Sequence, residues 1–216
     1  MAESCDVGVA LGRWVLNKAC RQHRLRIDSG TPAIGLSVNV SAALALSGDL
    51  FDAVNDALRL SALPAGLLEL EFPEGLIMTD AGTFSSYLMP LHDLGVKIAI
   101  DRFGTGNSSV EHLSGLPINR IKIDPVFVSA VGGNAQAARA IRAAAALAQG
   151  LDISVTAVGV ETSEQVDFIQ TLPIEEIQGF AFAKPMDAQS FDAFVNNFTD
   201  ATLSFPGAKG RTRLGI

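Results

Sequence analysis

The strongest constraint on the fold is an alternation of short β-branched runs with longer segments of helical periodicity. Six runs have the length and composition of buried strands: Ile34–Val40, Leu67–Phe72, Val96–Asp101, Arg120–Asp124, Ile153–Gly159 and Ile174–Phe180. Helical patterns cover Leu11–Arg24, Leu50–Leu60, Ala81–Leu94, Gln136–Ala148, Ser163–Leu172 and the segment after Asp187. A capping-box pattern at Thr162–Gln165 marks the start of one of these helices. Repeated strand–helix units predict an α/β fold whose parallel strands are joined by right-handed crossovers.

Composition limits the classes of protein to which the chain can belong. Its 216 residues suit one or at most two domains, and a hydrophobic content of 48% supplies a sizeable core. A net charge of −7 argues against a nucleic-acid surface. No apolar run reaches the roughly 18 residues of a membrane span, and the N-terminus lacks the pattern of a signal peptide. Cys5 and Cys20 have neither metal-site nor disulfide-framework spacing, which favours a cytoplasmic location.

Polar residues occur at the carboxyl ends of the predicted strands, where parallel α/β folds carry out their chemistry. These residues, in chain order, are Asn39, Glu71, Asp101, Lys122, Asp124, Glu161 and Gln178. Oxygen ligands from several strands suit hard divalent cations, and a neighbouring lysine suits a phosphate or a water nucleophile. The pattern therefore predicts a functional edge of the sheet.

Each of these residues also has a purely structural interpretation. A single acid after a strand is usually a helix N-cap or a solvated turn residue, and Asn39 could cap the helix that begins in "SAALALS". Lys122 could be a surface lysine, and Gln178 a satisfied polar residue. Gly104 and Gly106 could serve backbone geometry alone. Polar groups at several successive strand ends nevertheless favour the functional interpretation.

The order of the motifs "SVNVSA", "ELEFPE", "IDRFGTGNSSVEHLSGLPINRIKID", "VGVET" and "QGFAFAKPM" closely resembles the EAL domain, from Ala2 to about Phe198. Members of that family are (β/α)₈ barrels that hydrolyse cyclic di-GMP with two metal ions, Mg²⁺ or Mn²⁺. The resemblance implies metal ligands at Asn39, Glu71 and Asp101, a lysine beside the catalytic water at Lys122, and ligand-pocket residues at Arg102, Asp124, Glu161, Gln178 and Pro185. It also matches Glu74 to the second acid of an E-x-T-E pattern.

Several positions depart from the family pattern. Arg102 stands where the family usually has the second Asp before "FGTG", and Val158 stands where it usually has a Glu. The Glu-Ala-Leu signature is absent from the 216 residues, which predicts an incomplete barrel of about six strands over residues 1–198, followed by a loosely held tail at 199–216. We expect Lys122 to be vestigial and no metal to bind strongly.

The charge change at Arg102 explains the expected loss of metal binding. Exchanging a carboxylate for a guanidinium alters the local charge by two units, and a unit charge beside a dication at 4 Å interacts by about 8 kcal/mol at an effective dielectric of 20. Arg102 is expected either to pair with Asp101, Glu71 or Glu161 in the place of the cation, or to turn toward solvent.

Three functions are compatible with these residues. The chain is a non-catalytic EAL-like module that acts through protein contacts, a receptor that binds cyclic di-GMP without hydrolysing it, or a truncated phosphodiesterase. We favour the first. An incomplete barrel would have two open edges, at "GLSVNV" and "EEIQGF", and these edges predict self-association, a protein partner, or coverage by the N-terminal helix and the C-terminal tail. No nucleic acid and no membrane contact are expected within this chain.

Overall fold

A computed structural model describes residues 2–78, 81–106, 110–198 and 213–214. The chain forms two compact units, and each unit is made of three separate stretches of the sequence. The first unit comprises Met1–Phe72, Leu76–Ala99 and Gly115–Pro117. The second comprises Pro73–Gly75, Ile100–Ser114 and Ile118–Ile216. The predicted tail at 199–216 lies outside the described residues except for 213–214.

All six predicted strands are present, in a sheet whose strands follow the order of the sequence. They are β1 (Leu36–Asn39), β2 (Leu68–Pro73), β3 (Lys97–Phe103), β4 (Arg120–Ile123), β5 (Ser154–Val158) and β6 (Glu176–Gln178). A two-residue strand, β7 (Arg213–Leu214), pairs in parallel with β6. The pairs β1–β2, β4–β5 and β5–β6 are also parallel. The described residues thus form a TIM-like (β/α) fold with fewer strands than the eight of a closed barrel, as predicted.

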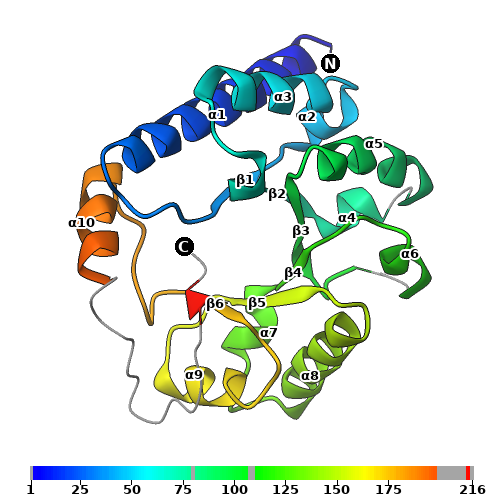
Figure 1. The fold of residues 1–216 in the computed structure, drawn as a ribbon. Helices are drawn as coiled ribbons and strands as arrows, with labels where there is room; N and C mark the ends of the chain where they lie inside the picture. The colour runs from blue at the N-terminus through cyan, green and yellow to red at the C-terminus, as the bar shows by residue number, and fades with distance from the viewer. Residues whose placement is uncertain (1, 79–80, 107–109, 199–212, 215–216) are drawn as a thin grey trace. The chain divides into compact units, whose positions relative to one another are not determined.

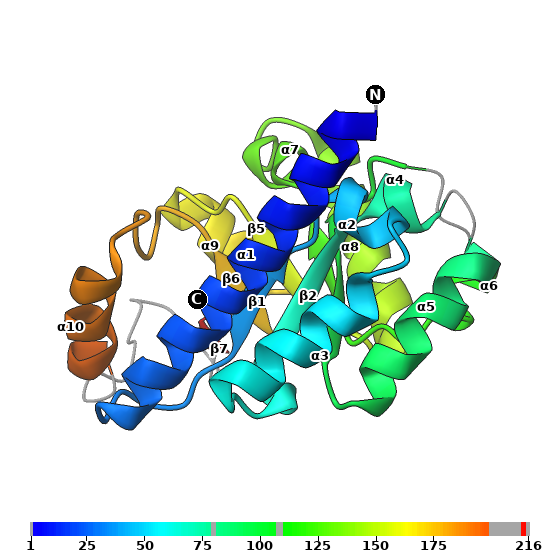
Figure 2. The same ribbon diagram turned by 90° about the horizontal axis from the view of Figure 1, so that it is seen from above.

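The first unit is built around α1 (Ala2–Asp28), which contacts β1, α2 (Ala42–Leu46) and α3 (Leu50–Ser61) (Figures 1 and 2). Gly8 and Gly12 permit a close approach, since an added Cβ would lie 2.8 Å from Ala43 and 3.0 Å from Leu44. Leu16, Cys20 and His23 continue the buried face of α1. The unit also contains η1 (Ala65–Leu67), α5 (Ala81–Asp93) and the second half of α4 (Glu74–Ile77).

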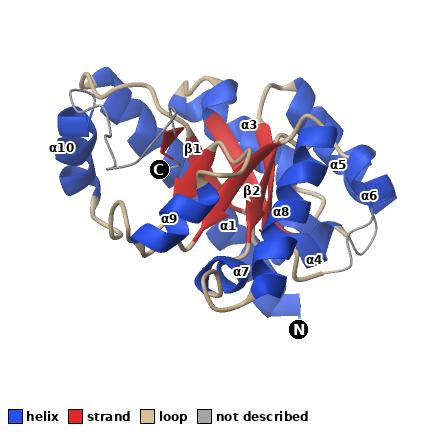
Figure 3. Cartoon of the chain, turned by 90° about the horizontal axis from the view of Figure 1, so that it is seen from below, coloured by secondary structure: helices blue, strands red, loops and turns tan. Residues whose placement is uncertain are grey.

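The second unit contains β4, β5 and β6 with their helices. These helices, labelled in Figure 3, are α6 (Val110–Ser114), α7 (Pro125–Ser129), α8 (Ala135–Gly150), α9 (Ser163–Ile169) and α10 (Ala188–Phe198). Asn134 is the N-cap of α8, and its side chain accepts hydrogen bonds from backbone amides in the first turn of that helix. The predicted capping box at the start of α9 is confirmed. The Thr162 hydroxyl accepts a hydrogen bond from the Gln165 amide, and the Gln165 side chain accepts one from the Thr162 amide.

Candidate functional site

The register of β4, β5 and β6 places apolar and polar side chains on opposite faces of the sheet. Ile121 is aligned with Val155, and Ala157 is aligned with both Ile123 and Ile177. All five of these residues are buried. Because side chains alternate along a strand, the residues between them share the other face. That face carries Arg120, Lys122, Thr156, Val158, Glu176 and Gln178.

A polar network links the early residues of this face. Arg120 Nη1 lies 2.8 Å from Glu176 Oε2 and donates a 3.1 Å hydrogen bond to Thr156 Oγ1. The Thr156 hydroxyl in turn donates to Glu176 Oε2 at 3.3 Å. The network joins three neighbouring strands by charge-assisted bonds. Sequence reasoning missed it, although the alternation along each strand places all three residues on one face.

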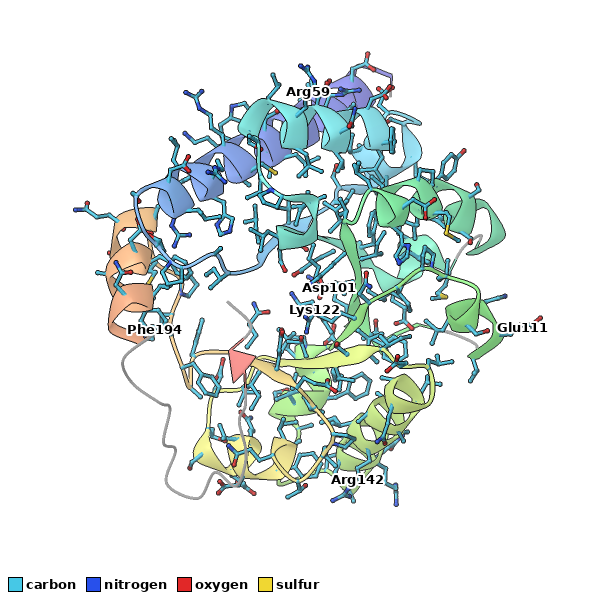
Figure 4. All side chains as sticks on the ribbon, viewed as in Figure 1. Arg59, Asp101, Glu111, Lys122, Arg142 and Phe194 are labelled. Atoms are coloured by element: carbon cyan, nitrogen blue, oxygen red, sulfur yellow. The ribbon has the colours of Figure 1, made fainter. Side chains whose placement is uncertain are left out.

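Asp101 and Lys122 lie near the carboxyl ends of β3 and β4 (Figure 4). The Asp124 amide donates a 3.2 Å hydrogen bond to the Phe103 carbonyl, which brings these strand ends together. Lys122 is only 8% exposed, so the interpretation as a surface lysine is wrong, whereas Asp101 is half-buried. The chain therefore holds a carboxylate and an ammonium group at the edge where the sequence predicted chemistry.

Arg102 adopts a left-handed backbone conformation with φ of +58° and has an exposed side chain. This region is unfavourable for a long side chain and is tolerated best by Gly, Asn and Asp. In the described part of the second unit, no ion pair joins Arg102 to Asp101 or Glu161. Within the second unit, the Arg102 side chain is therefore exposed and pairs with neither of these two carboxylates.

The glycine-rich loop after β3 is held by the buried carboxylate of Glu74. Glu74 Oε2 accepts hydrogen bonds from the amides of Gly104, Thr105 and Gly106 at 3.1, 3.1 and 2.8 Å. Gly104 has φ of +99°, and an added Cβ would lie 2.9 Å from the ring of Phe127. Both backbone conformation and close packing thus require glycine at that position. Successive amides that converge on one anion form a backbone nest, and Glu74 occupies it.

Two of the predicted site residues lie in the first unit. Glu71 is buried on β2, and Asn39 is the exposed last residue of β1. Asn39 is not the cap of the following helix, because the Ser41 hydroxyl accepts the hydrogen bond from the Leu44 amide at the start of α2.

The remaining predicted residues lie in the second unit and carry several backbone contacts. Asp124 accepts a 2.8 Å hydrogen bond from the Val126 amide and is the N-cap of α7. Val158 is aligned with Gln178, whose carbonyl accepts bonds from the amides of Gly159 and Val160. The side chain of Gln178 is exposed.

The loop positions after β5 and β6 are exposed as well. The Glu161 amide donates a hydrogen bond to Gln165 Oε1, and the Glu161 side chain is exposed. Pro185 is exposed two residues before Asp187. The hydrogen bond from the Ser190 amide lowers the pKa of Asp187. Both segments leave their polar side chains accessible to a ligand.

Two residues of the second unit are unfavourable for a two-metal centre. Val158 offers no ligand atom, and the guanidinium of Arg102 directly follows the Asp101 carboxylate. Among the residues that the structure describes, no three acidic, histidine or cysteine side chains are grouped so that they could hold a metal ion. No helix in the described ranges is long and apolar enough to cross a membrane.

Comparisons with known proteins agree with the fold and the order of these motifs. The model of the EAL domain family matches residues 1–185. The bifunctional diguanylate cyclase/cyclic di-GMP phosphodiesterase MucR of Pseudomonas aeruginosa is 37% identical over 195 residues, which are 90% of this chain and 28% of MucR. Signaling protein YkoW of Bacillus subtilis is 32% identical over 90% of this chain and 24% of its own length. The chain thus spans about a quarter of the length of these relatives.

Solved structures give the same result. The structure of PaMucR phosphodiesterase in complex with c-di-GMP has a TM-score of 0.84 and 37% identity, and the match covers 88% of this chain and 77% of that one. The EAL domain of Mycobacterium smegmatis DcpA has a TM-score of 0.83 and 32% identity, over 88% of this chain and 85% of that one. With a family match over most of its length and relatives above 30% identity, this chain belongs to the EAL domain family.

Proposed function

We propose that the chain is an EAL domain of cyclic di-GMP signalling that acts through protein contacts and does not hydrolyse the nucleotide. The observation that carries this proposal is Arg102, an exposed cation in a left-handed conformation directly after Asp101. The family usually places a second carboxylate there. Val158 supports the proposal, because it stands where the family usually has a further carboxylate, on the same face of the sheet as Lys122.

The electrostatic cost of Arg102 is large compared with the strength of a metal site. In two-metal hydrolases, cations about 3.5–4 Å apart stabilise the attacking and leaving oxygens. At an effective dielectric of 20, a guanidinium 4 Å from a dication adds about 8 kcal/mol of repulsion. Solvent around the exposed side chain lowers this figure, but a loss of only about 1.4 kcal/mol already weakens binding tenfold.

Hydrolysis and metal binding test the proposal separately. With Mg²⁺ or Mn²⁺ present, the purified chain is expected to produce no linear dinucleotide above the level of a Lys122→Ala control. Titration with Mn²⁺ is expected to give at least tenfold tighter binding for Arg102→Asp than for the wild type, because the local charge falls by two units. Turnover that depends on Lys122 would refute the proposal, and equal Mn²⁺ affinities would show that Arg102 is not what excludes the metal.

The second candidate is a receptor that binds cyclic di-GMP without hydrolysing it. The exposed guanidinium of Arg102 favours it, since arginine suits a phosphate and, among the described residues of the second unit, this side chain pairs with neither Asp101 nor Glu161. Calorimetric titration decides between the candidates. Micromolar binding that is lost in Arg102→Asp would establish the receptor, whereas the absence of heat up to about 100 µM, a ligand range that covers micromolar affinities, would leave the interaction module.

A further inference from the structure

The outer edge of β6, in the second unit, is covered by residues from the C-terminal end of the same chain. Arg213 and Leu214 form β7, which is aligned in parallel with Glu176 and Ile177 of β6. Figure 1 shows β7 as a short red arrow beside β6. An edge strand presents a row of backbone groups to which another strand can add. β7 therefore marks a surface that accepts an added strand.

The position of β7 continues the strand–helix order of the second unit. A parallel neighbour cannot follow a strand directly, because the chain must first cross back over the sheet, usually as a helix. Between β6 and β7 the chain forms α10, and residues 199–212 connect the end of α10 to β7. The segment thus takes the place of the next strand in a series of βαβ units, which favours a specific pairing over a chance contact.

The charge of the C-terminal segment is complementary to the sequence at which β6 begins. Residues 201–216 contain three cations and no acidic residue: Lys209, Arg211 and Arg213. The sequence at the start of β6 has two adjacent acids, Glu175 and Glu176. Glu176 is paired with Arg120, whereas Glu175 is exposed. At 0.1 M salt, charges attract over a screening distance of about 10 Å, so this end of β6 favours a cationic segment.

The hydrogen bonds between the loop after β5 and β6 show which β6 amide faces β7. The Gln178 carbonyl accepts hydrogen bonds from the amides of Gly159 and Val160, so the backbone of Gln178 faces β5. Backbone groups point alternately to the two sides of a strand. The amide of Glu176 therefore also faces β5, whereas the amide of Ile177 faces β7.

The same alternation assigns the backbone groups of β7. Leu214 is aligned with Ile177. In a parallel pair, the residue aligned with an inward-facing residue directs its own backbone groups away from the partner strand. The amide of Arg213 therefore faces β6, and the amide of Leu214 faces away from it.

We propose that the outer edge of β6 is a docking surface for an extended peptide strand, and that residues 213–214 of this chain occupy it reversibly through backbone pairing. A two-residue strand makes few hydrogen bonds of small net value, so we expect the closed state to exceed the open state only about tenfold. The tether through residues 199–212 gives an effective concentration on the order of 1 mM, so a separate peptide should bind with a dissociation constant of about 100 µM. This docking uses neither Arg102 nor Lys122, and it does not depend on the proposed function.

Hydrogen exchange at the Ile177 amide of the 216-residue chain tests the pairing. Arg213→Pro removes the amide that faces β6, and Ile177 is expected to exchange about tenfold faster than in the wild type. Leu214→Pro is the matched control, because an edge strand tolerates proline where its N–H faces away, and Ile177 should stay protected. Arg213→Ala removes the charge but keeps the amide, so its exchange should stay closer to that of the wild type. Unchanged exchange at Glu176 and Gln178, which face β5, verifies that each variant is folded.

A peptide of residues 208–216 tests docking of a separate strand. Added to the Arg213→Pro protein at about 1 mM, ten times the expected dissociation constant, it should restore the protection of Ile177. The same peptide carrying Arg213→Pro should not restore it, because it lacks the amide that pairs with β6.

Three results would overturn the proposal. The first is equal exchange of Ile177 in the wild type and in Arg213→Pro, since β7 would then protect nothing. The second is a Leu214→Pro protein in which Ile177 exchanges as fast as in Arg213→Pro, because the backbone pairing would then be wrong. The third is an Ile177 amide that stays unprotected with the unmodified peptide at about 1 mM, because the edge would then not accept a separate strand.

Discussion

Replacing Glu74 with alanine would remove the acceptor shared by three backbone amides of the glycine-rich loop. The carboxylate oxygen lies 2.8–3.1 Å from the amide nitrogens of residues 104–106, and the Glu74 side chain is 2% exposed. Hydrogen bonds to a charged group each contribute about 1.5–3 kcal/mol, but water can replace part of them because the loop itself is exposed. We therefore expect the free energy of unfolding to fall by about 2–4 kcal/mol, well below the sum of three full bonds.

Urea unfolding gives the change in stability, and hydrogen exchange at residues 104–106 gives its location. Glu74→Gln keeps an acceptor oxygen without the charge. Its free energy of unfolding should fall by about half as much as that of Glu74→Ala, since neutral hydrogen bonds are roughly half as strong as charged ones. Glu111→Ala is the control, because Glu111 is an exposed glutamate on α6 (Figure 4). A Glu74→Ala protein within about 0.5 kcal/mol of the wild type, the usual range for surface substitutions, and with unchanged loop exchange would refute this reasoning.

Three further outcomes follow from contacts away from the loop. Burial lowers the pKa of His23 below 6.5, so the unfolded state binds the proton first, and the free energy of unfolding should decrease as pH falls below 6.5; a pH titration of His23→Gln should lack this decrease. Arg120→Met alone should cost about 1–3 kcal/mol because it leaves Glu176 half-buried without its cation, and a double-mutant cycle with Glu176→Met in urea should recover part of that loss. Thr162→Ala removes a helix cap and should cost about 1 kcal/mol in the same assay.

The strands were predictable because burial limits the types of residue that a strand can carry on each face of the sheet. β2 shows a period of two along the strand, since Leu68, Leu70 and Phe72 alternate with two glutamates, and all five of these residues are buried. The short helices α4, α6 and α7 were not predicted, because four or five residues are too few to show helical periodicity. The helix α1 is longer than predicted and begins at Ala2, and its second apolar face obscures the single stripe by which an amphipathic helix is usually detected.

The candidate site was predictable as a set of positions but not as a set of contacts. Strand ends identified Asp101 and Lys122, because parallel strands present their last residues at one edge. The contact of Glu74 with the glycine-rich loop was not predictable, since about thirty residues separate its partners in sequence. Asp124 was predicted as a ligand-pocket residue, and its helix cap shows that one side chain can also have the structural role that the sequence left open.

The two sheet edges that an incomplete barrel would leave differ in this structure. The edge predicted at "EEIQGF", Glu175–Phe180, has a neighbour, because β7 pairs with β6. At the other end of the sheet, the Val40 amide donates to the Glu71 carbonyl, and alternation along a parallel strand then directs the amides of Ser37 and Asn39 away from β2.

Hydrogen exchange should therefore alternate along β1. In the monomer, the amides of Ser37 and Asn39 are expected to exchange much faster than those of Val38 and Val40, which face β2. Protection of Ser37 and Asn39 that appears only at high concentration would mean that copies pair through this edge. If both amides are as protected as Val38 in a monomer, β1 is not an open edge, and self-association through it is excluded.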